Sequence, residues 1–251
     1  MFRDCMRIIP LTEVPLIDVG DDVVGFLLKS MEAQGLDLED DDVLVIAQTV
    51  VSKSEGSIVD LSSIDPSPRA REIAEKIGEK PKQVEVILDQ TDEIVRLEHV
   101  IISRTKHGFV CANAGVDSSN VESGNVTVLP ENPDESAKEI RKRLKKETGK
   151  DVAVIISDSW GRPFRLGAVG FAIGSAGVKP LEHLKGRKDA YGGLLKTTTL
   201  APPDSLAAAA SLEMGEADEG VPAAIIKDAP YTPGEGSIRD ISRPLEEDLF
   251  R

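Results

Sequence analysis

The chain has few cysteines and no long apolar run. Cys5 and Cys111 are the only cysteines among its 251 residues. Two thiols are too few for a disulfide framework or a four-cysteine zinc site, so a reducing compartment is expected. No stretch approaches the roughly 18 uncharged apolar residues of a membrane-spanning helix, and the start, MFRDCMRIIP, lacks the apolar segment of a signal peptide. We therefore expect a cytoplasmic protein that does not enter a membrane.

Positive charge is scarce. The sequence contains 30 Lys and Arg against 44 Asp and Glu, which gives a formal net charge of -14. A phosphate backbone or an anionic membrane surface would be repelled by such a chain unless positive charge were concentrated locally, which argues against binding to nucleic acid or membrane through general electrostatics. A small polyanion could still bind where a few Lys or Arg side chains and a divalent cation gather in one cleft.

Familiar nucleotide and metal motifs are absent as well. The sequence contains neither GxxxxGK followed by Ser or Thr nor GxGxxG, which excludes P-loop and Rossmann-type nucleotide sites. His99, His107 and His183 are isolated and have no metal-ligand spacing. Any nucleotide must therefore be held by a different loop architecture.

Short Val/Ile-rich runs alternate irregularly with helical patterns. This irregularity predicts a mixed α+β fold rather than a regular βαβ array, and the length suits one large domain or two modest ones. The predicted strands are 43–48, 100–103, 126–129, 152–157 and 223–227. The predicted helices are 21–33, 68–78, 81–89, 134–147 and 205–215, the last with Asp204 as its N-cap. The glycine-dense region 161–192 shows no long helix or strand pattern and is predicted to be a functional connection.

Two aspartates follow apolar segments and lie among small hydroxyl residues. Asp117 and Asp158 are placed where strand exits would put them at the mouth of a crevice. Two carboxylates brought together repel, so a divalent cation bridging them to phosphate oxygens is a natural partner. Asn120 and Ser159 supply neutral oxygens suited to Mg²⁺ or Mn²⁺. The alternative is that each aspartate only caps a turn or helix.

Other candidates each have a structural alternative. Lys53 could neutralise a phosphate beside Thr49 and Ser52, or be a solvated lysine in the turn after strand 43–48. Glu216 could be a metal ligand, or part of an acidic turn at 213–220. Trp160 could form the wall of a ligand site or belong to the core. Four basic residues suggest an anionic second substrate, although surface ion pairs would also explain them: Arg162, Arg165, Arg187 and Lys188.

Six segments together resemble one family, the coenzyme F420-0:L-glutamate ligases, or F420 gamma-glutamyl ligases. They are VPLIDVGDD (14–22), QTVVSKSEG (48–56), NAGVDSSN (113–120), SDSWGRPFRLGAVGFAIGSAG (157–177), GRKDAYG (186–192) and MGEADEGVPA (214–223). The resemblance covers nearly the whole chain in order. It implies a GTP-dependent ligase that activates the F420-0 carboxylate, most simply as an acyl phosphate, for attack by the amine of L-glutamate. Further γ-linked glutamates would be added in the same way.

The resemblance also implies an architecture and a set of ligands. It implies two interwoven domains, a homodimer, two Mg²⁺ or Mn²⁺ ions and K⁺ as a further candidate ion. We expect no additional flavin-nitroreductase-like domain within residues 1–251. Metal ligation maps to Asp117, Asp158 and Ser159, with Glu216 added on its chemistry. Nucleotide contacts map to Thr12, Glu13, Val14, Pro15, Gln48, Thr49, Lys53, Asn120, Met214, Gly215 and Glu216.

Alternatives from other classes remain open at the level of sequence. One is a metal-dependent phosphohydrolase, or an amide ligase acting on a different carboxylate acceptor. Another is a nucleotide-binding regulatory module without turnover. The pair Asp117 and Asp158 favours the enzymes, because metal-assisted chemistry needs both carboxylates and simple binding does not.

Overall fold

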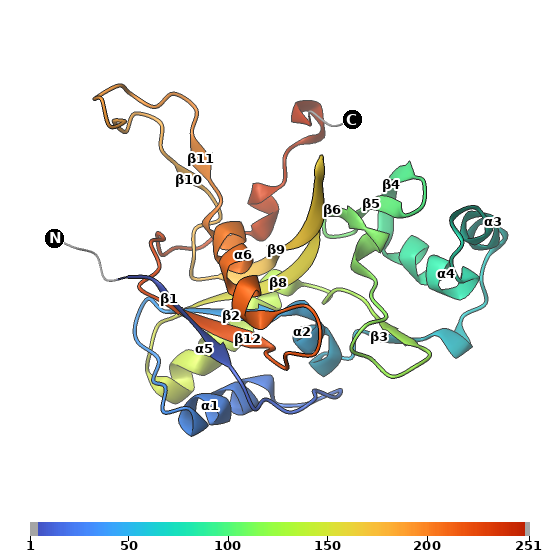
Figure 1. Ribbon diagram of the computed structural model, residues 1–251, viewed down its shortest axis with the longest axis horizontal. Coiled ribbons are helices and arrows are strands. Elements are labelled where there is room, and N and C mark those ends of the chain that lie inside the picture. The colour runs from blue at the N-terminus through green and yellow to red at the C-terminus, as the bar shows by residue number, and fades with distance from the viewer. Residues whose placement is uncertain (1–4, 249–251) are drawn as a thin grey trace.

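A five-stranded sheet forms the centre of the protein. The computed structural model describes residues 5–248, so the first four residues of the N-terminal segment and residues 249–251 lie outside it. The strand order is β1-β12-β2-β8-β9, with β2 and β8 parallel and the other neighbours antiparallel (Figure 1). The strands are β1 (Arg7–Leu11), β2 (Val43–Ala47), β8 (Ala153–Arg162), β9 (Arg165–Ala176) and β12 (Ala223–Lys227).

The inner strands β2 and β12 and the first half of β8 are apolar because helices cover the sheet there. In β2 and β12 nearly every residue is buried, as expected for strands without a solvent-facing side. Two helices approach the backbone of β9 at glycines: a Cβ on Gly170 would lie 2.6 Å from the carbonyl oxygen of Ala207, and one on Gly174 would collide with the carbonyl of Pro133. The helices around the sheet are α1 (Val23–Ala33), α2 (Gln48–Ser54), α5 (Pro133–Thr148) and α6 (Pro202–Met214).

A second, smaller hydrophobic core lies within the segment between α2 and α5 (Figure 1, teal to green). Its buried residues include Ile73, Ile87, Ile101 and Val126, which are separate from the main core. The elements of this segment are β3 (Ile58–Asp60), η1 (Leu61–Ser63), α3 (Pro68–Ile77), α4 (Pro81–Gln90), β4 (Thr91–Leu97), β5 (Ile101–Thr105), β6 (Val110–Ala112), η2 (Asn113–Gly115) and β7 (Asn125–Thr127).

A long hairpin projects from the body between β9 and α6. Its two short strands, β10 (Glu182–His183) and β11 (Thr199–Leu200), pair near its base (Figure 1, upper left). The chain then finishes with η3 (Ile238–Ile241) and η4 (Leu245–Glu247). Among residues 5–248, none of the helices has the length and apolar character needed to span a bilayer.

The mixed α+β class is confirmed, while four local predictions are wrong. The region 161–192 contains β9, a 12-residue strand, and β8 continues through Asp158 instead of ending before it. Residues 48–54 form α2, so Lys53 lies on a helix and not in a turn. Asp204 is not an N-cap, because α6 begins after Ala201, and its carboxylate instead accepts a hydrogen bond from the Ala172 amide at 3.1 Å.

Candidate active site

The register of the sheet brings four separate chain segments to one edge. Leu11 pairs with Ala223, Ala223 also pairs with Ile46, and Ala47 pairs with Ser157. The ends of β1, β2 and the apolar part of β8 therefore lie beside the start of β12. The segments that leave the sheet here include predicted nucleotide or metal residues: 12–15, 48–53, 158–159 and the loop before β12, 213–222.

Asp158 lies at the centre of this edge with other carboxylates around it. The side chain is partly buried on β8, and the amide of Ser159 donates to its Oδ1 at 2.8 Å. Burial, followed by the nearby carboxylates of Asp117 and Glu216, raises the pKa of Asp158 to about 7. The hydroxyl of Ser159 donates to the Glu216 carboxylate at 2.7 Å. All four residues predicted as metal ligands thus lie in one neighbourhood.

The loop that carries Asp117 is held in a strained but well-supported conformation. Asp117 Oδ1 accepts hydrogen bonds from the amide of Ser119 at 2.9 Å and from its hydroxyl at 2.8 Å. Asn113, Ala114 and Asn120 have φ values of 52°, 53° and 54°, a region that residues other than glycine seldom adopt. Such strain persists only where the surroundings fix the backbone, and it is common at ligand sites.

Helix α2 ties this loop to the sheet edge. Lys53 Nζ donates to the backbone carbonyl of Asn120 at 3.3 Å, and the hydroxyl of Ser52 donates to that of Val128 at 2.8 Å. Gln48 is buried, and its amide contacts the Ser52 hydroxyl at 2.5 Å, so it anchors α2. Thr49 and Lys53 are the partly exposed members of the predicted nucleotide set on this helix.

The segment after β1 forms another part of the edge. Glu13 has a φ of 60°, and the carbonyl of Thr12 accepts a hydrogen bond from the Ser30 hydroxyl of α1 at 2.6 Å. The backbone of this turn is therefore fixed, while the side chains of Glu13 and Pro15 are exposed and that of Val14 packs partly against the core.

The oxygen donors of the site suit a hard divalent cation, although they are not preassembled around one. Within residues 5–248, no three or more His, Cys, Asp or Glu side chains converge closely enough to hold a metal. Carboxylates and a hydroxyl are nevertheless the ligands that Mg²⁺ and Mn²⁺ prefer. Burial is the main cause of the raised pKa of Asp158, and the carboxylates of Asp117 and Glu216 add to it; a bound cation would favour the ionised form.

Comparison with known proteins assigns this arrangement to a family. The model of the F420-0:Gamma-glutamyl ligase family matches residues 12–228. The chain belongs to this family. It is 50% identical over 249 residues to the coenzyme F420:L-glutamate ligase of Methanothermobacter thermautotrophicus, covering 98% of this chain and 99% of that protein. The protein of the same name from Methanocaldococcus jannaschii is 52% identical over 240 residues, covering 95% and 94% of the two chains.

The resemblance of this F420-0:gamma-glutamyl ligase family member to its relatives persists at lower identity. The coenzyme F420:L-glutamate ligase of Archaeoglobus fulgidus is 43% identical over 246 residues, covering 98% of this chain and 96% of that protein. The family resemblance inferred from the six sequence segments is therefore confirmed.

The basic residues predicted to bind substrate lie on two projecting hairpins of the ligase-family fold. Arg162 and Arg165 flank the turn between β8 and β9, roughly 13 Å along the strand from Asp158, and Arg162 donates to the carbonyl of Gly167 at 3.1 Å. Arg187 and Lys188 lie on the β10–β11 hairpin, where Arg187 forms an exposed ion pair with Glu182 at 3.3 Å. The four residues do not form a single cluster.

Trp160 is held among aromatic rings beside the site. Its ring stacks on that of Phe171, with centroids 4.9 Å apart, and lies 6.2 Å from that of Phe109. One face is therefore occupied by protein, which agrees with the interpretation of Trp160 as a packing residue. The sequence interpretation missed Cys111, a buried thiol near Asp158 whose pKa rises to about 12 through burial and that carboxylate. No local motif marks it.

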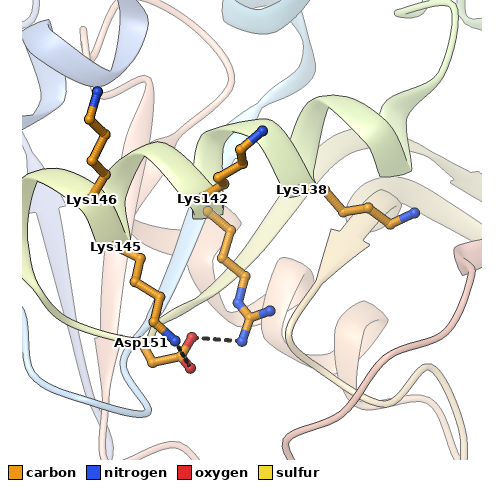
Figure 2. A pocket seen from close by; sticks show the side chains of 6 residues that line it. Lys138, Lys142, Lys145, Lys146 and Asp151 are labelled. Carbon is orange, nitrogen blue, oxygen red and sulfur yellow. Dashed lines mark hydrogen bonds and ion pairs between the residues drawn. The ribbon is translucent and has the colours of Figure 1, made fainter.

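A recess on the surface of this ligase-family member does not coincide with the carboxylate cluster. It has a volume of about 430 Å³ and lies on α5 (Figure 2). The side chains of Lys145 and Arg141 both contact Asp151, at 2.7 and 2.6 Å, so much of its positive charge is already neutralised. The sheet edge therefore remains the better candidate site.

Gly215 fixes the direction of the loop that carries Glu216. It ends α6 with φ 73° and ψ −175°, a region open almost only to glycine, and a Cβ there would collide with the Glu219 side chain. We expect Gly215→Ala to cost about 1–3 kcal/mol of folding free energy. Ligase activity per folded molecule should also fall, because Glu216 would be displaced. Urea unfolding and steady-state rates measure the two effects.

Gly220→Ala is the matched control for this substitution. Gly220 also has a positive φ, 68°, but apart from its chain neighbours no atom of residues 5–248 lies within 4 Å of its would-be Cβ. Activity equal to wild type in Gly215→Ala would show that the loop conformation does not position Glu216.

Proposed function

We propose that this protein is a GTP-dependent coenzyme F420-0:L-glutamate ligase that can add further γ-linked glutamates. The observation that carries the proposal is that the carboxylates of Asp117 and Glu216 lie near that of Asp158, with the Ser159 hydroxyl, at a sheet edge that also presents Lys53. Three relatives are coenzyme F420:L-glutamate ligases, which supports F420-0 as the acceptor and L-glutamate as the amino acid. The protein is expected to act in the cytoplasm.

The proposed chemistry has two steps. A carboxylate oxygen of F420-0 attacks the γ-phosphorus of GTP, the bond to the β-phosphate oxygen breaks, and GDP leaves. The amine nitrogen of L-glutamate then attacks the acyl carbon, phosphate leaves, and the nitrogen loses a proton as the amide forms. No protein nucleophile is required, which agrees with a site built of carboxylates, a hydroxyl and a lysine.

The residues of the chain would act by binding and charge placement. Asp117, Asp158, Ser159 and Glu216 would hold two Mg²⁺ or Mn²⁺ ions, with K⁺ as an additional candidate. When bound, these ions would neutralise charge on the transferring phosphoryl oxygens. Lys53 lies on α2 and its Nζ donates to the Asn120 carbonyl, so it would place a point charge at the phosphates. The exposed segment 12–15 and the loop 213–220 would enclose the rest of the nucleotide.

A homodimer is proposed on the basis of exposed apolar side chains. Leu166 and Tyr191, both 99% exposed, lie on the two projecting hairpins, and Leu194 on the longer one is 63% exposed. Burial of these side chains against a second copy of the chain would remove their apolar area from water. Arg165, Arg187 and Lys188 lie on the same hairpins, so association would also determine what surrounds these cations.

The direct test is product formation from purified components. Protein, F420-0, L-glutamate, GTP and Mg²⁺ or Mn²⁺ are incubated, and product masses and GDP release are followed together. We expect glutamyl additions coupled to GDP, with little product when ATP replaces GTP and none without glutamate. GDP release without any change in the mass of F420-0 would contradict the proposal and point to a phosphohydrolase or another carboxylate acceptor.

A further inference from the structure

A second recess lies apart from the carboxylate cluster and is lined by positive charge. It has a volume of about 350 Å³ and lies between the β4–β5 hairpin with its following turn and the C-terminal segment at η3. Its ionisable lining side chains are Arg104, Lys106, His107, Arg239 and a single acid, Asp92. Such a concentration is unusual in a chain with a net charge of -14. The volume falls within the range of about 300–1,000 Å³ that is typical of small-molecule sites.

Two of these cations have no partner in the part of the chain that the structure describes. The side chains of Lys106 and Arg239 form no ion pair within residues 5–248, although acidic residues outnumber basic ones. Arg104, by contrast, pairs with Asp92 at 2.6 Å and with Glu93 at 3.4 Å. The recess thus keeps two uncompensated positive charges supplied by elements far apart in the sequence.

His107 adds a buried polar atom without a partner. His107 is only 9% exposed. Its Nε2 lies 2.9 Å from the Pro130 carbonyl oxygen and 3.2 Å from that of Glu131. Because both carbonyls are acceptors, Nε2 carries the hydrogen, and Nδ1 has no hydrogen-bond partner among the described residues. In this tautomer Nδ1 is an acceptor, so it does not contact an oxyanion itself; His107 instead reports on the recess that it lines.

We propose that this recess binds an oxyanion, the phosphate group of a small phosphorylated molecule or inorganic phosphate, through Arg239 and Lys106. The guanidinium of Arg239 suits phosphate because it can donate two parallel hydrogen bonds, and the Lys106 ammonium adds a point charge. A bound oxyanion would also neutralise the two cations next to His107. None of these residues belongs to the proposed ligase machinery, so this site stands independently of the proposed function.

Two spectroscopic probes lie close to the recess. The His107 ring itself is one of three histidines in the chain. It stacks on Phe109 with ring centroids 5.9 Å apart, and Phe109 lies 6.2 Å from Trp160, the sole tryptophan. Occupation of the recess should therefore move the imidazole resonances of His107 and change the fluorescence of Trp160.

The test is titration of the full chain with inorganic phosphate, at constant ionic strength and without GTP or divalent cations. Imidazole resonances are followed by NMR, with His107→Gln identifying the His107 signal. We expect this signal to shift saturably while those of His99 and His183 do not. Arg239→Gln and Lys106→Gln should each weaken binding by about tenfold, the usual contribution of a charged hydrogen bond.

Matched variants make the result specific. Lys142→Gln changes a lysine of the α5 recess that is paired with Glu139, and phosphate affinity should be unchanged. Lys53→Gln weakens the proposed nucleotide site and should leave the His107 shift intact, which separates this site from the ligase site. A shift of His107 that never saturates, or equal affinity in Arg239→Gln and wild type with both proteins folded, would overturn the proposal.

Discussion

Asp158→Asn is expected to lower ligase activity by about 10³-fold or more, because metal-assisted charge stabilisation is worth several kcal/mol. Asparagine retains the size and one oxygen of the side chain but loses the charge that would hold a cation beside Asp117 and Glu216. The amide of Ser159 can still donate to the remaining oxygen, as it does to Oδ1 at 2.8 Å. Initial rates at saturating substrates, with metal varied, measure the effect.

The same substitution should stabilise the metal-free protein at alkaline pH. The pKa of Asp158 is raised to about 7 in the fold, so the native state binds more protons than the unfolded state between pH 4 and 7. The ionised carboxylate therefore destabilises the fold increasingly as pH rises through this window, and by a constant amount above it. At pH 8 the free energy of unfolding of Asp158→Asn should exceed that of the wild type by a few kcal/mol. This difference should disappear near pH 4.

Asp204→Asn provides the matched control. Burial also raises the pKa of Asp204, and the Ala172 amide donates to its carboxylate as the Ser159 amide does to Asp158. It lies on α6, outside the carboxylate cluster, so its replacement should leave activity unchanged. Wild-type rates in Asp158→Asn, or loss of activity in both variants alike, would contradict a metal-binding role for Asp158.

The buried strands could be predicted because their sequence signal is local. The runs in β2, β8 and β12 consist of Val, Ile, Leu and Ala because both sides of the strands are covered there. Strand β9 gave no such signal, since glycine occurs where α6 and α5 approach its backbone, at Gly170 and Gly174. That requirement comes from tertiary packing, which periodicity does not encode.

The site was predictable in its residue types but not in its assembly. Asp158 and Asp117 could be singled out by their neighbours in sequence, and the family resemblance related them to each other. Their proximity depends on long-range pairings, such as Asp117 with Thr127 and Lys53 with the Asn120 carbonyl, which no local pattern specifies. The left-handed backbone of Ala114 is likewise imposed by its surroundings, because alanine has no intrinsic preference for it.

Lys227→Ala is expected to destabilise the protein by about 3–5 kcal/mol, the usual cost of leaving a buried charge without its partner. Lys227 is 6% exposed at the end of β12, and its Nζ lies 3.0 Å from the carboxylate of Asp42, which is 4% exposed. Glu39, at 3.1 Å, is largely exposed and contributes less. For a chain of this length the midpoint of thermal unfolding should fall by roughly 10 °C.

The pH dependence and a double variant separate charge from packing. Burial lowers the pKa of Lys227, but the hydrogen bonds to Asp42 and Glu39 outweigh it and raise the pKa overall. The contribution of Lys227 is therefore fully present below the unfolded pKa near 10.5 and is lost only as pH rises through the higher folded value. The loss in Lys227→Ala should therefore be constant from pH 6 to 9. A double variant, Lys227→Met with Asp42→Asn, removes both charges and fills the volume of the lysine side chain. In the wild type the backbone amide of Glu39 donates to the Asp42 carboxylate at 2.8 Å, and the asparagine oxygen can still accept this hydrogen bond. This double variant should recover most of the stability, since an uncharged replacement of a buried pair is often neutral. The pair lies at the end of β12 opposite the carboxylate cluster, so activity per folded molecule should remain at the wild-type level. If the single and double variants were destabilised equally, the loss would come from packing and not from the unpaired charge.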